Sequence, residues 1–195
     1  MNSELQSELK KILNSRFSES ESTRLNYARG EDTYDPILSK AVVFPETNEE
    51  VSKILKLCNQ HKIPVVPFGT GTSLEGNVVG NDQGITISLE KMNKVLSVNL
   101  EDFDCKVQSC VTREQLNDYI REDGVFFPID PGANAAIGGM ASTSASGTMA
   151  VKYGTMKTVI TGLTVVLPNG DIIKTGSRTK KTSAGYNLTN LFIGS

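Results

Sequence analysis

The sequence has no tryptophan, one histidine and three cysteines among its 195 residues. The cysteines, Cys58, Cys105 and Cys110, are odd in number and at spacings that match neither a disulfide framework nor a zinc site. We therefore expect free thiols in a reducing compartment and no metal held by this chain. A chain of this length is long enough for one domain of usual size, or two small subdomains, with a hydrophobic core.

The sequence also lacks an excess of charge. Lys and Arg number 20 against 22 Asp and Glu, and a net charge of −2 excludes a nucleic-acid binder held by bulk electrostatics. No run of about 18 apolar residues exists, so we expect no transmembrane segment. The polar, acidic N-terminus does not resemble a secretory signal or a transit peptide. These features predict a cytoplasmic protein, or one bound peripherally at the inner membrane.

The pattern of the first half of the chain predicts alternating helices and strands. Residues 3–15 predict an amphipathic helix, and residues 18–23 predict a loop. The apolar face of that helix comprises Leu5, Leu9, Ile12 and Leu13. A strand at 41–44, a helix that starts at the capping box of Thr47 and ends near His61, and a strand at 64–67 predict a parallel strand–helix–strand unit.

The second half predicts further strands and one more helix. Residues 85–89 alternate as in a half-buried strand, and strands are expected over 94–100 and 104–111. A second capping box at Thr112 opens a helix that Gly124 ends. We expect its Leu116, Tyr119 and Ile120 to point inward. Alternation over 163–167 and the Asn169-Gly170 pair predict a hairpin. The fold class expected is α+β, with two subdomains joined near residue 100.

Glycine is concentrated in two stretches, Gly69–Gly84 and Gly132–Gly154. The first follows a predicted parallel strand and reads Phe68-Gly-Thr-Gly-Thr-Ser-Leu-Glu-Gly76. It fails the dinucleotide fingerprint G-x-G-x-x-G because Leu74 stands at the third glycine. It fails the P-loop pattern because Asn77 stands where a phosphate-binding lysine is required, which argues against an ATPase. Either a phosphate nest of backbone N–H groups or a flexible turn fits what remains.

The second stretch is a ribbon of small residues from Pro131 to Val151 that carries no charged side chain. Such a ribbon suits a ligand that approaches the backbone closely. Two separated ribbons of Gly, Ser and Thr suggest a long, phosphate-bearing ligand lying between two subdomains.

These segments resemble the FAD-linked oxidases of the vanillyl-alcohol oxidase fold, known also as the p-cresol methylhydroxylase (PCMH) type. Within that group they are similar to the cytochrome-linked D-lactate dehydrogenases and to their relatives among the glycolate oxidase subunits. The resemblance covers roughly residues 37–195. The motifs that carry it are Val42–Pro45, Ile63–Gly76, Phe126–Ala133, Ile137–Thr148, Val151–Met156 and Ser183–Leu188. It implies a helix and arm at 1–36 and an FAD-binding domain at 37–195, divided at about residue 100 and incomplete at its C-terminus.

The resemblance also implies the residues that bind FAD. The pyrophosphate would lie on backbone N–H groups of the first loop, and the ribbon would line the flavin and ribityl chain. The implied set is Phe68, Gly69, Thr70, Gly71, Thr72, Ser73, Leu74, Gly76, Pro131, Gly132, Ile137, Gly138, Gly139, Ala141, Ser144, Ser146, Gly147, Tyr153 and Gly154. Because neither loop contains His or Cys, we expect non-covalent FAD.

The function implied is oxidation of a D-2-hydroxy acid, D-lactate preferred, to the 2-oxo acid by hydride transfer to flavin N5. The alternatives are a parent enzyme specific for glycolate or D-2-hydroxyglutarate, and an FAD-binding subunit or fragment without activity. The resemblance implies a longer enzyme whose C-terminal domain holds the catalytic base and any metal, so no catalytic residue is expected here. A cytochrome or quinone would accept the electrons.

Several charged or reactive residues have two readings. His61 is a ligand or base, or a solvated residue at a helix end. Cys105 and Cys110 are redox-active or serve the packing. The basic group Lys174, Arg178, Lys180 and Lys181 grips a phosphate or partner, or forms a solvated loop. The acidic group Glu101, Asp102 and Asp104 binds a metal or forms a charged turn. Finally, Arg29, Glu31, Asp32 and Tyr34 form an arm docked on the FAD domain or a disordered leader.

Overall fold

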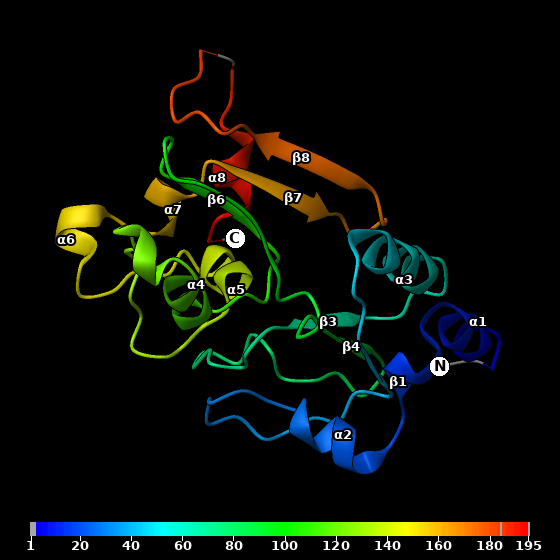
Figure 1. Cartoon of the computed structure of the whole chain (residues 1–195). Coiled ribbons are helices and arrows are strands. Elements are labelled where there is room, and N and C mark those ends of the chain that lie inside the picture. The colour runs from blue at the N-terminus through cyan, green and yellow to red at the C-terminus, as the bar shows by residue number, and fades with distance from the viewer. Residues whose placement is uncertain (1–2, 184, 195) are drawn as a thin grey trace. The chain divides into compact units, whose positions relative to one another are not determined.

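The computed structural model describes residues 3–183 and 185–194 (Figure 1), so Ala184 of the quoted 183–188 motif lies outside the described residues. The chain divides into two compact units. Unit 1 contains the described residues up to Met92 together with Val166–Ile173, and unit 2 contains Asn93–Val165 and the described residues from Lys174 onward. The predicted domain limits stay a prediction.

Unit 1 is built on a four-stranded sheet in the order β1-β2-β4-β3. The strands are β1 (Phe17–Ser18), β2 (Val42–Val43), β3 (Val65–Phe68) and β4 (Ile85–Ser88). Both β2 and β3 pair with β4 in parallel, and β1 pairs with β2 antiparallel. The predicted parallel strand–helix–strand unit is therefore confirmed, with β4 inserted between its two strands.

All four residues of β4 are buried, so the prediction of a half-buried strand is wrong. A strand flanked on both sides by partners and covered on both faces gives no residue access to solvent. Its polar side chains are tolerated because they find partners: the Thr86 and Ser39 hydroxyls lie 2.8 Å apart and form a buried hydrogen bond.

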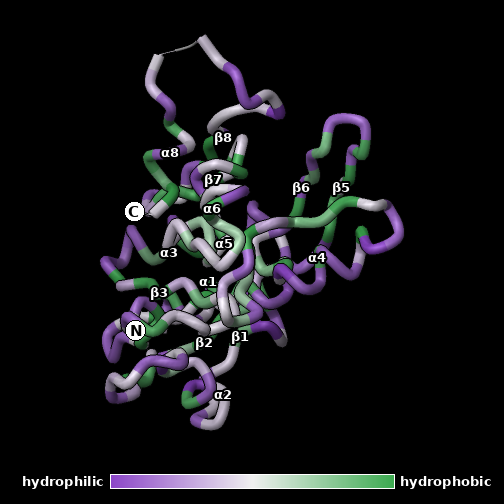
Figure 2. Tube along the Cα trace, turned by 90° about the vertical axis from the view of Figure 1, so that its left-hand side faces the viewer, coloured by the Kyte–Doolittle hydropathy of each residue, from purple (hydrophilic) through white to green (hydrophobic). Residues whose placement is uncertain are grey.

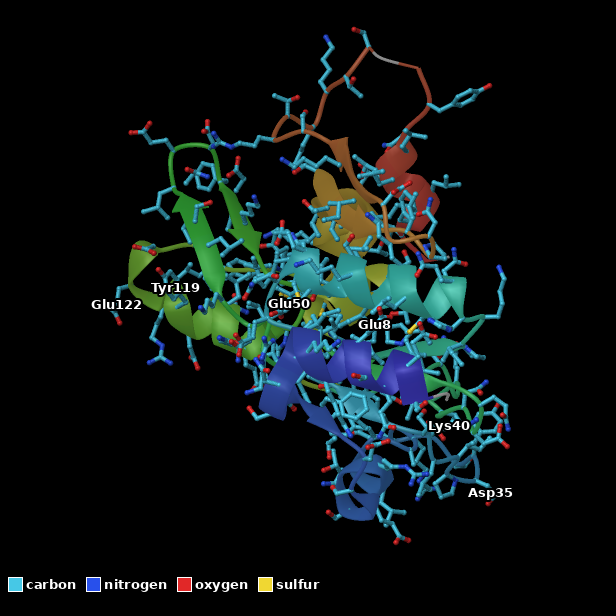
Figure 3. The ribbon with its side chains drawn as sticks, turned by 90° about the vertical axis from the view of Figure 1, so that its right-hand side faces the viewer. Glu8, Asp35, Lys40, Glu50, Tyr119 and Glu122 are labelled. Atoms are coloured by element: carbon cyan, nitrogen blue, oxygen red, sulfur yellow. The ribbon has the colours of Figure 1, made fainter. Side chains whose placement is uncertain are left out.

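Two helices cover one face of this sheet. They are α1 (Ser3–Leu13) and α3 (Asn48–Gln60), which lie side by side in Figure 3. Leu5, Leu9 and Leu13 of α1 are fully buried, as the spacing predicts, whereas Ile12 is only partly buried. The core on this face comprises these leucines with Phe17, Ala41, Val43, Ile54, Cys58, Ile85 and Ile87. Thr47 accepts the predicted N-cap hydrogen bond from the Glu50 N–H at 3.1 Å.

The loop predicted over 18–23 is wrong. After the single-turn 3-10 helix Asn14–Arg16, strand β1 ends at Ser18 and helix α2 (Glu21–Asn26) begins almost at once. Ser20 makes this start possible because its hydroxyl accepts from the Thr23 N–H and satisfies one unpaired donor of the first turn. Such a serine-rich stretch suits a helix cap as well as a loop.

Unit 2 is built on a hairpin and short helices. The hairpin pairs β5 (Val95–Asn99) with β6 (Asp104–Val107), is bulged between Val95 and Ser97, and has a mostly hydrophilic tip (Figure 2). Strand β6 ends before the predicted residue 111 because a turn from Gln108 to Val111 follows it. The helices are α4 (Arg113–Tyr119), α5 (Ile137–Ser142), α6 (Ala150–Tyr153), α7 (Met156–Val159) and α8 (Leu188–Phe192). The core comprises Val111, Leu116, Ile120, Ile129, Ile137, Met140, Ala141, Met156 and Ile193.

Helix α4 begins as predicted, with Thr112 accepting from the Gln115 N–H at 3.2 Å. Leu116 and Ile120 point into the core, but Tyr119 is 64% exposed and lies on the outer side of the helix (Figure 3). The inward placement of Tyr119 is therefore wrong. A single 3-10 turn, Arg121–Asp123, follows α4, and Gly124 ends it in the left-handed conformation.

The predicted hairpin after residue 162 is confirmed as β7 (Gly162–Val166) paired with β8 (Ile172–Gly176). Its Asn169-Gly170 turn belongs to unit 1, where the Ser52 hydroxyl donates to the Gly170 carbonyl at 2.5 Å. Within the part of the chain that the structure describes, no helix is both long enough and apolar enough to cross a bilayer.

Candidate functional site

The first glycine loop leaves the carboxyl end of β3 in unit 1. Phe68, the last residue of β3, is buried, and its ring lies over Gly71. Gly71 has φ +73°, a conformation that favours glycine. Between Phe68 and Gly80 the loop contains no Lys or Arg and a single carboxylate, Glu75. A ligand held here would contact backbone and hydroxyl groups rather than cations.

Apart from Glu75, the polar side chains of this loop are small and neutral. Ser73 donates its hydroxyl to Asn77 Oδ1 at 2.6 Å, which closes the far side of the turn. The Thr70 and Thr72 hydroxyl oxygens are 3.4 Å apart. The backbone N–H groups of Gly71 and Thr72 donate to no other group in the described part of the chain. Such N–H groups form the donor set of an anion nest.

The second loop lies in unit 2. Gly132 and Gly139 face open space, because a Cβ at either position would meet no atom within 4 Å. These two glycines suit a ligand that approaches the backbone. Ser146 is exposed, and Ser144 has φ +49° and packs against Gly194.

Three of the predicted ribbon residues serve the packing of unit 2. The side chains of Ile137 and Ala141 are buried in its core. Gly138 packs on Ser109, and a Cβ there would come within 2.8 Å of the Ser109 carbonyl oxygen. This arrangement explains why small or apolar residues stand at these positions without reference to a ligand. Their contact with FAD stays a prediction.

Tyr153 and Gly154 end α6. The Tyr153 ring contacts Phe126 edge to face, with centroids 5.5 Å apart, and the Lys152 ammonium lies 4.9 Å from its centroid. Gly154 packs against Thr158. The tyrosine is thereby fixed on one side by an aromatic ring and a cation.

Asp130 orients the second loop, and the sequence motifs do not single it out. Its carboxylate accepts from the Thr148 hydroxyl and, at 3.1 Å, from the Met149 N–H. Gly147 lies so close that a Cβ there would be 2.2 Å from Asp130 Oδ1. These hydrogen bonds lower the pKa of Asp130, and the bond from Thr148 has the largest effect. The available signal is its place as the last charged residue before the uncharged ribbon.

The structure also shows the surroundings of several residues for which the sequence left two interpretations open. Arg178 donates to Asp104 at 2.8 Å and to Asp102 at 2.6 Å, so a basic and an acidic residue from the two groups pair with each other. His61 is the C-cap residue of α3. Among the described residues, Cys58, Cys105 and Cys110 form no disulfide.

The donors present fit an organic pyrophosphate. The first loop supplies unpaired N–H groups and hydroxyls on a glycine backbone, and the second supplies open glycine surface that a flat ring system could approach. Neither loop contains His or Lys, and Glu75 is the only carboxylate that they contain.

Comparison with known proteins identifies the family of this chain. Residues 39–176 match the family model described as "FAD binding domain". The chain is 50% identical to "Probable D-lactate dehydrogenase, mitochondrial" of Danio rerio over 88% of this chain and 35% of the relative. It is 44% identical to "D-lactate dehydrogenase [cytochrome], mitochondrial" of Arabidopsis thaliana over 98% of this chain and 34% of the relative. The chain thus spans about a third of the length of these relatives.

Among solved structures, p-cresol methylhydroxylase with bound substrate matches 97% of this chain and 40% of its own, with 25% identity and a TM-score of 0.82. This match confirms the predicted α+β fold of the PCMH type. The family match identifies FAD as the cofactor. The chain belongs to the FAD-binding domain family.

Proposed function

We propose that this chain is the FAD-binding part of a flavin-dependent oxidoreductase that oxidises a D-2-hydroxy acid, D-lactate preferred, to the 2-oxo acid. The observation that carries the proposal is the family match over 39–176 together with relatives named D-lactate dehydrogenase. The first loop supports it, because this loop has no Lys or Arg and backbone donors can hold a pyrophosphate.

The role of this chain is to bind and orient the cofactor. The N–H groups of Gly71 and Thr72 would bind the pyrophosphate, and the open backbone at Gly132 and Gly139 would lie against the ring and ribityl chain. When bound, FAD would supply the hydride acceptor that oxidation of the substrate α-carbon requires. The residues that take the proton of the substrate hydroxyl are expected outside this chain.

Non-covalent binding belongs to the same proposal. Neither loop contains a cysteine or histidine. Burial raises the pKa of the Cys58 thiol to about 12, so this cysteine is a poor nucleophile at neutral pH. Acid denaturation of the protein should therefore release unmodified FAD.

The test uses the protein that carries this chain, purified and compared with the isolated 195-residue chain. The proposal expects yellow protein, release of FAD on denaturation, and bleaching of the flavin by D-lactate under anaerobic conditions, with L-lactate as control. A colourless protein that does not bind added FAD would overturn it. Faster bleaching by glycolate or D-2-hydroxyglutarate would assign the substrate to one of those acids.

The isolated chain separates the remaining alternative. We expect it to bind FAD without reduction by D-lactate, because the catalytic base is expected outside this chain. If the chain belongs to an FAD-binding subunit without activity, the isolated chain would give the same result. In that case D-lactate would also fail to bleach the flavin of the whole protein. A cytochrome is the proposed electron acceptor, because the name of the Arabidopsis relative includes the word cytochrome. The location in the cell stays a prediction.

A further inference from the structure

Residues 27–37, called the arm here, form a closed turn that belongs to unit 1. Asp32 is only 6% exposed, and its carboxylate accepts from the N–H groups of Gly30 and Tyr34 at 3.1 and 3.0 Å. The Ala28 carbonyl accepts from the N–H groups of Ile37 and Gly80. The turn therefore has an internal structure of its own and is joined by its backbone to the end of the glycine loop.

Aromatic packing anchors the start of the arm beside β3. The Tyr27 ring contacts Phe68 edge to face with centroids 4.9 Å apart, and contacts Phe44 at 5.6 Å. Its hydroxyl donates to Glu90. Phe68 in turn lies over Gly71, so the arm and the glycine loop share one aromatic support.

The arm also holds the glycine loop directly. The Glu31 N–H donates to the Gly71 carbonyl at 2.8 Å. A Cβ on Gly30 would lie 2.3 Å from that same carbonyl oxygen, and a Cβ on Gly76 would lie 2.8 Å from the Tyr34 ring. The two backbones can approach this closely only because both contact positions are glycine.

This hydrogen bond determines the orientation of one peptide group. In a trans peptide the C=O and the next N–H point in opposite directions, and the described chain has no cis peptide. With the Gly71 carbonyl directed at the arm, the Thr72 N–H must point away from it. A peptide free to rotate could instead present its carbonyl oxygen to an anion, which would repel it.

We propose that the arm is a positioning element of the FAD pyrophosphate site: it fixes the Gly71–Thr72 peptide so that the Thr72 N–H faces the pyrophosphate. The inference rests on the proposed function, because it takes the first loop as the pyrophosphate site. It assigns a role to Gly30 and to the backbone of Glu31, both outside the predicted FAD-binding set.

The test compares Gly30→Ala with two controls in the FAD-bound protein that carries this chain. The added methyl of Gly30→Ala collides with the Gly71 carbonyl and should raise the Kd for FAD about tenfold or more, as expected for losing a hydrogen bond to a charged group. Glu31→Ala keeps the N–H and should bind normally. Asp35→Ala alters an exposed residue at the edge of the arm (Figure 3) and should also bind normally.

Two spectroscopic readouts separate positioning from general damage. In Gly30→Ala, the ³¹P resonances of bound FAD should move while the visible spectrum of the flavin stays unchanged. In the wild-type protein, the Thr72 amide ¹⁵N–¹H resonance should shift strongly when FAD binds, a measurement that requires no variant to fold. Equal Kd and ³¹P values in Gly30→Ala and wild type, or a Thr72 amide that FAD does not shift, would overturn the inference. If wild type does not bind FAD at all, the proposed function fails instead.

Discussion

Arg16 and Glu50 form an ion pair that joins the N-terminal helix region to α3. The guanidinium donates to both Glu50 oxygens at 2.6 Å and to the Phe44 carbonyl at 3.1 Å. The Glu50 carboxylate also accepts from the Glu46 N–H, and the Thr47 N–H of the predicted capping box contributes to lowering its pKa. The hydrogen bond from Arg16, first among the causes, lowers the pKa of Glu50 to about 2.

The pair predicts a defined pH dependence of stability. Glu50 ordinarily titrates near 4.5, and its pKa in the folded chain is about 2. Its contribution is therefore present above pH 4.5 and lost as pH falls from 4.5 toward 2. Both side chains are 20% exposed, so solvent screening keeps the contribution to roughly 1 kcal/mol. Glu50→Gln should lower the free energy of unfolding by this amount at pH 7, measured by urea denaturation.

The neighbouring Glu49→Gln, which alters an exposed residue of the same helical turn, is the matched control and should change stability little. The difference between wild type and Glu50→Gln should shrink steadily below pH 4.5. A difference that stays constant from pH 7 to pH 3 would show that the ion pair does not account for it.

At the scale of elements, the second loop is ordered by one carboxylate rather than by regular structure. Helix α6 has only four residues, too few to be stable without outside support. Asp130 provides that support from across the loop by binding Thr148 and Met149 just before α6 begins. The predicted FAD residues Gly147 and Tyr153 lie on this segment.

Removal of the carboxylate should loosen the segment without unfolding unit 2. In Asp130→Ala, the Met149 amide loses its acceptor and should exchange with deuterium about tenfold faster or more. Asp123→Ala, at an exposed position in the same unit, should leave that rate unchanged. Hydrogen exchange measured by NMR tests this prediction. Equal exchange rates of the Met149 amide in wild type, Asp130→Ala and Asp123→Ala would show that Asp130 does not order this segment.

For the whole molecule, a net charge of −2 is compatible with phosphate binding because neither predicted loop uses cations. No Lys or Arg occurs between Phe68 and Gly80 or between Pro131 and Val151. Dissolved salt screens charges on exposed side chains, but it weakens hydrogen bonds from oriented backbone N–H groups far less. FAD binding should therefore depend little on ionic strength.

We expect the Kd for FAD to change less than about threefold between roughly 50 and 500 mM NaCl, measured by quenching of flavin fluorescence. Leu74→Lys places a cation at a position of the first loop that is 70% exposed and should introduce a salt dependence. A steep salt dependence in the unmodified protein would show that Lys or Arg side chains contribute to binding after all.

Local signals account for the elements that the sequence predicts correctly. The apolar spacing of α1, the caps at Thr47 and Thr112 and the Asn169-Gly170 turn each depend on residues close in sequence. The failures share a different cause. Whether β4 is half or fully buried, and whether Tyr119 points in or out, depends on what packs against them from elsewhere in the chain.

The sequence by itself determined the α+β class, the two glycine-rich loops without Lys or Arg and the resemblance to FAD-linked oxidases, because short-range patterns and the order of motifs depend only on the sequence. Only the tertiary structure decided that the arm is docked rather than a disordered leader, that Glu31 binds the Gly71 carbonyl and that Asp130 holds the second loop. The Glu31–Gly71 and Asp130–Met149 contacts join residues 40 and 19 positions apart, and no local propensity specifies which distant carbonyl or N–H a given group will meet.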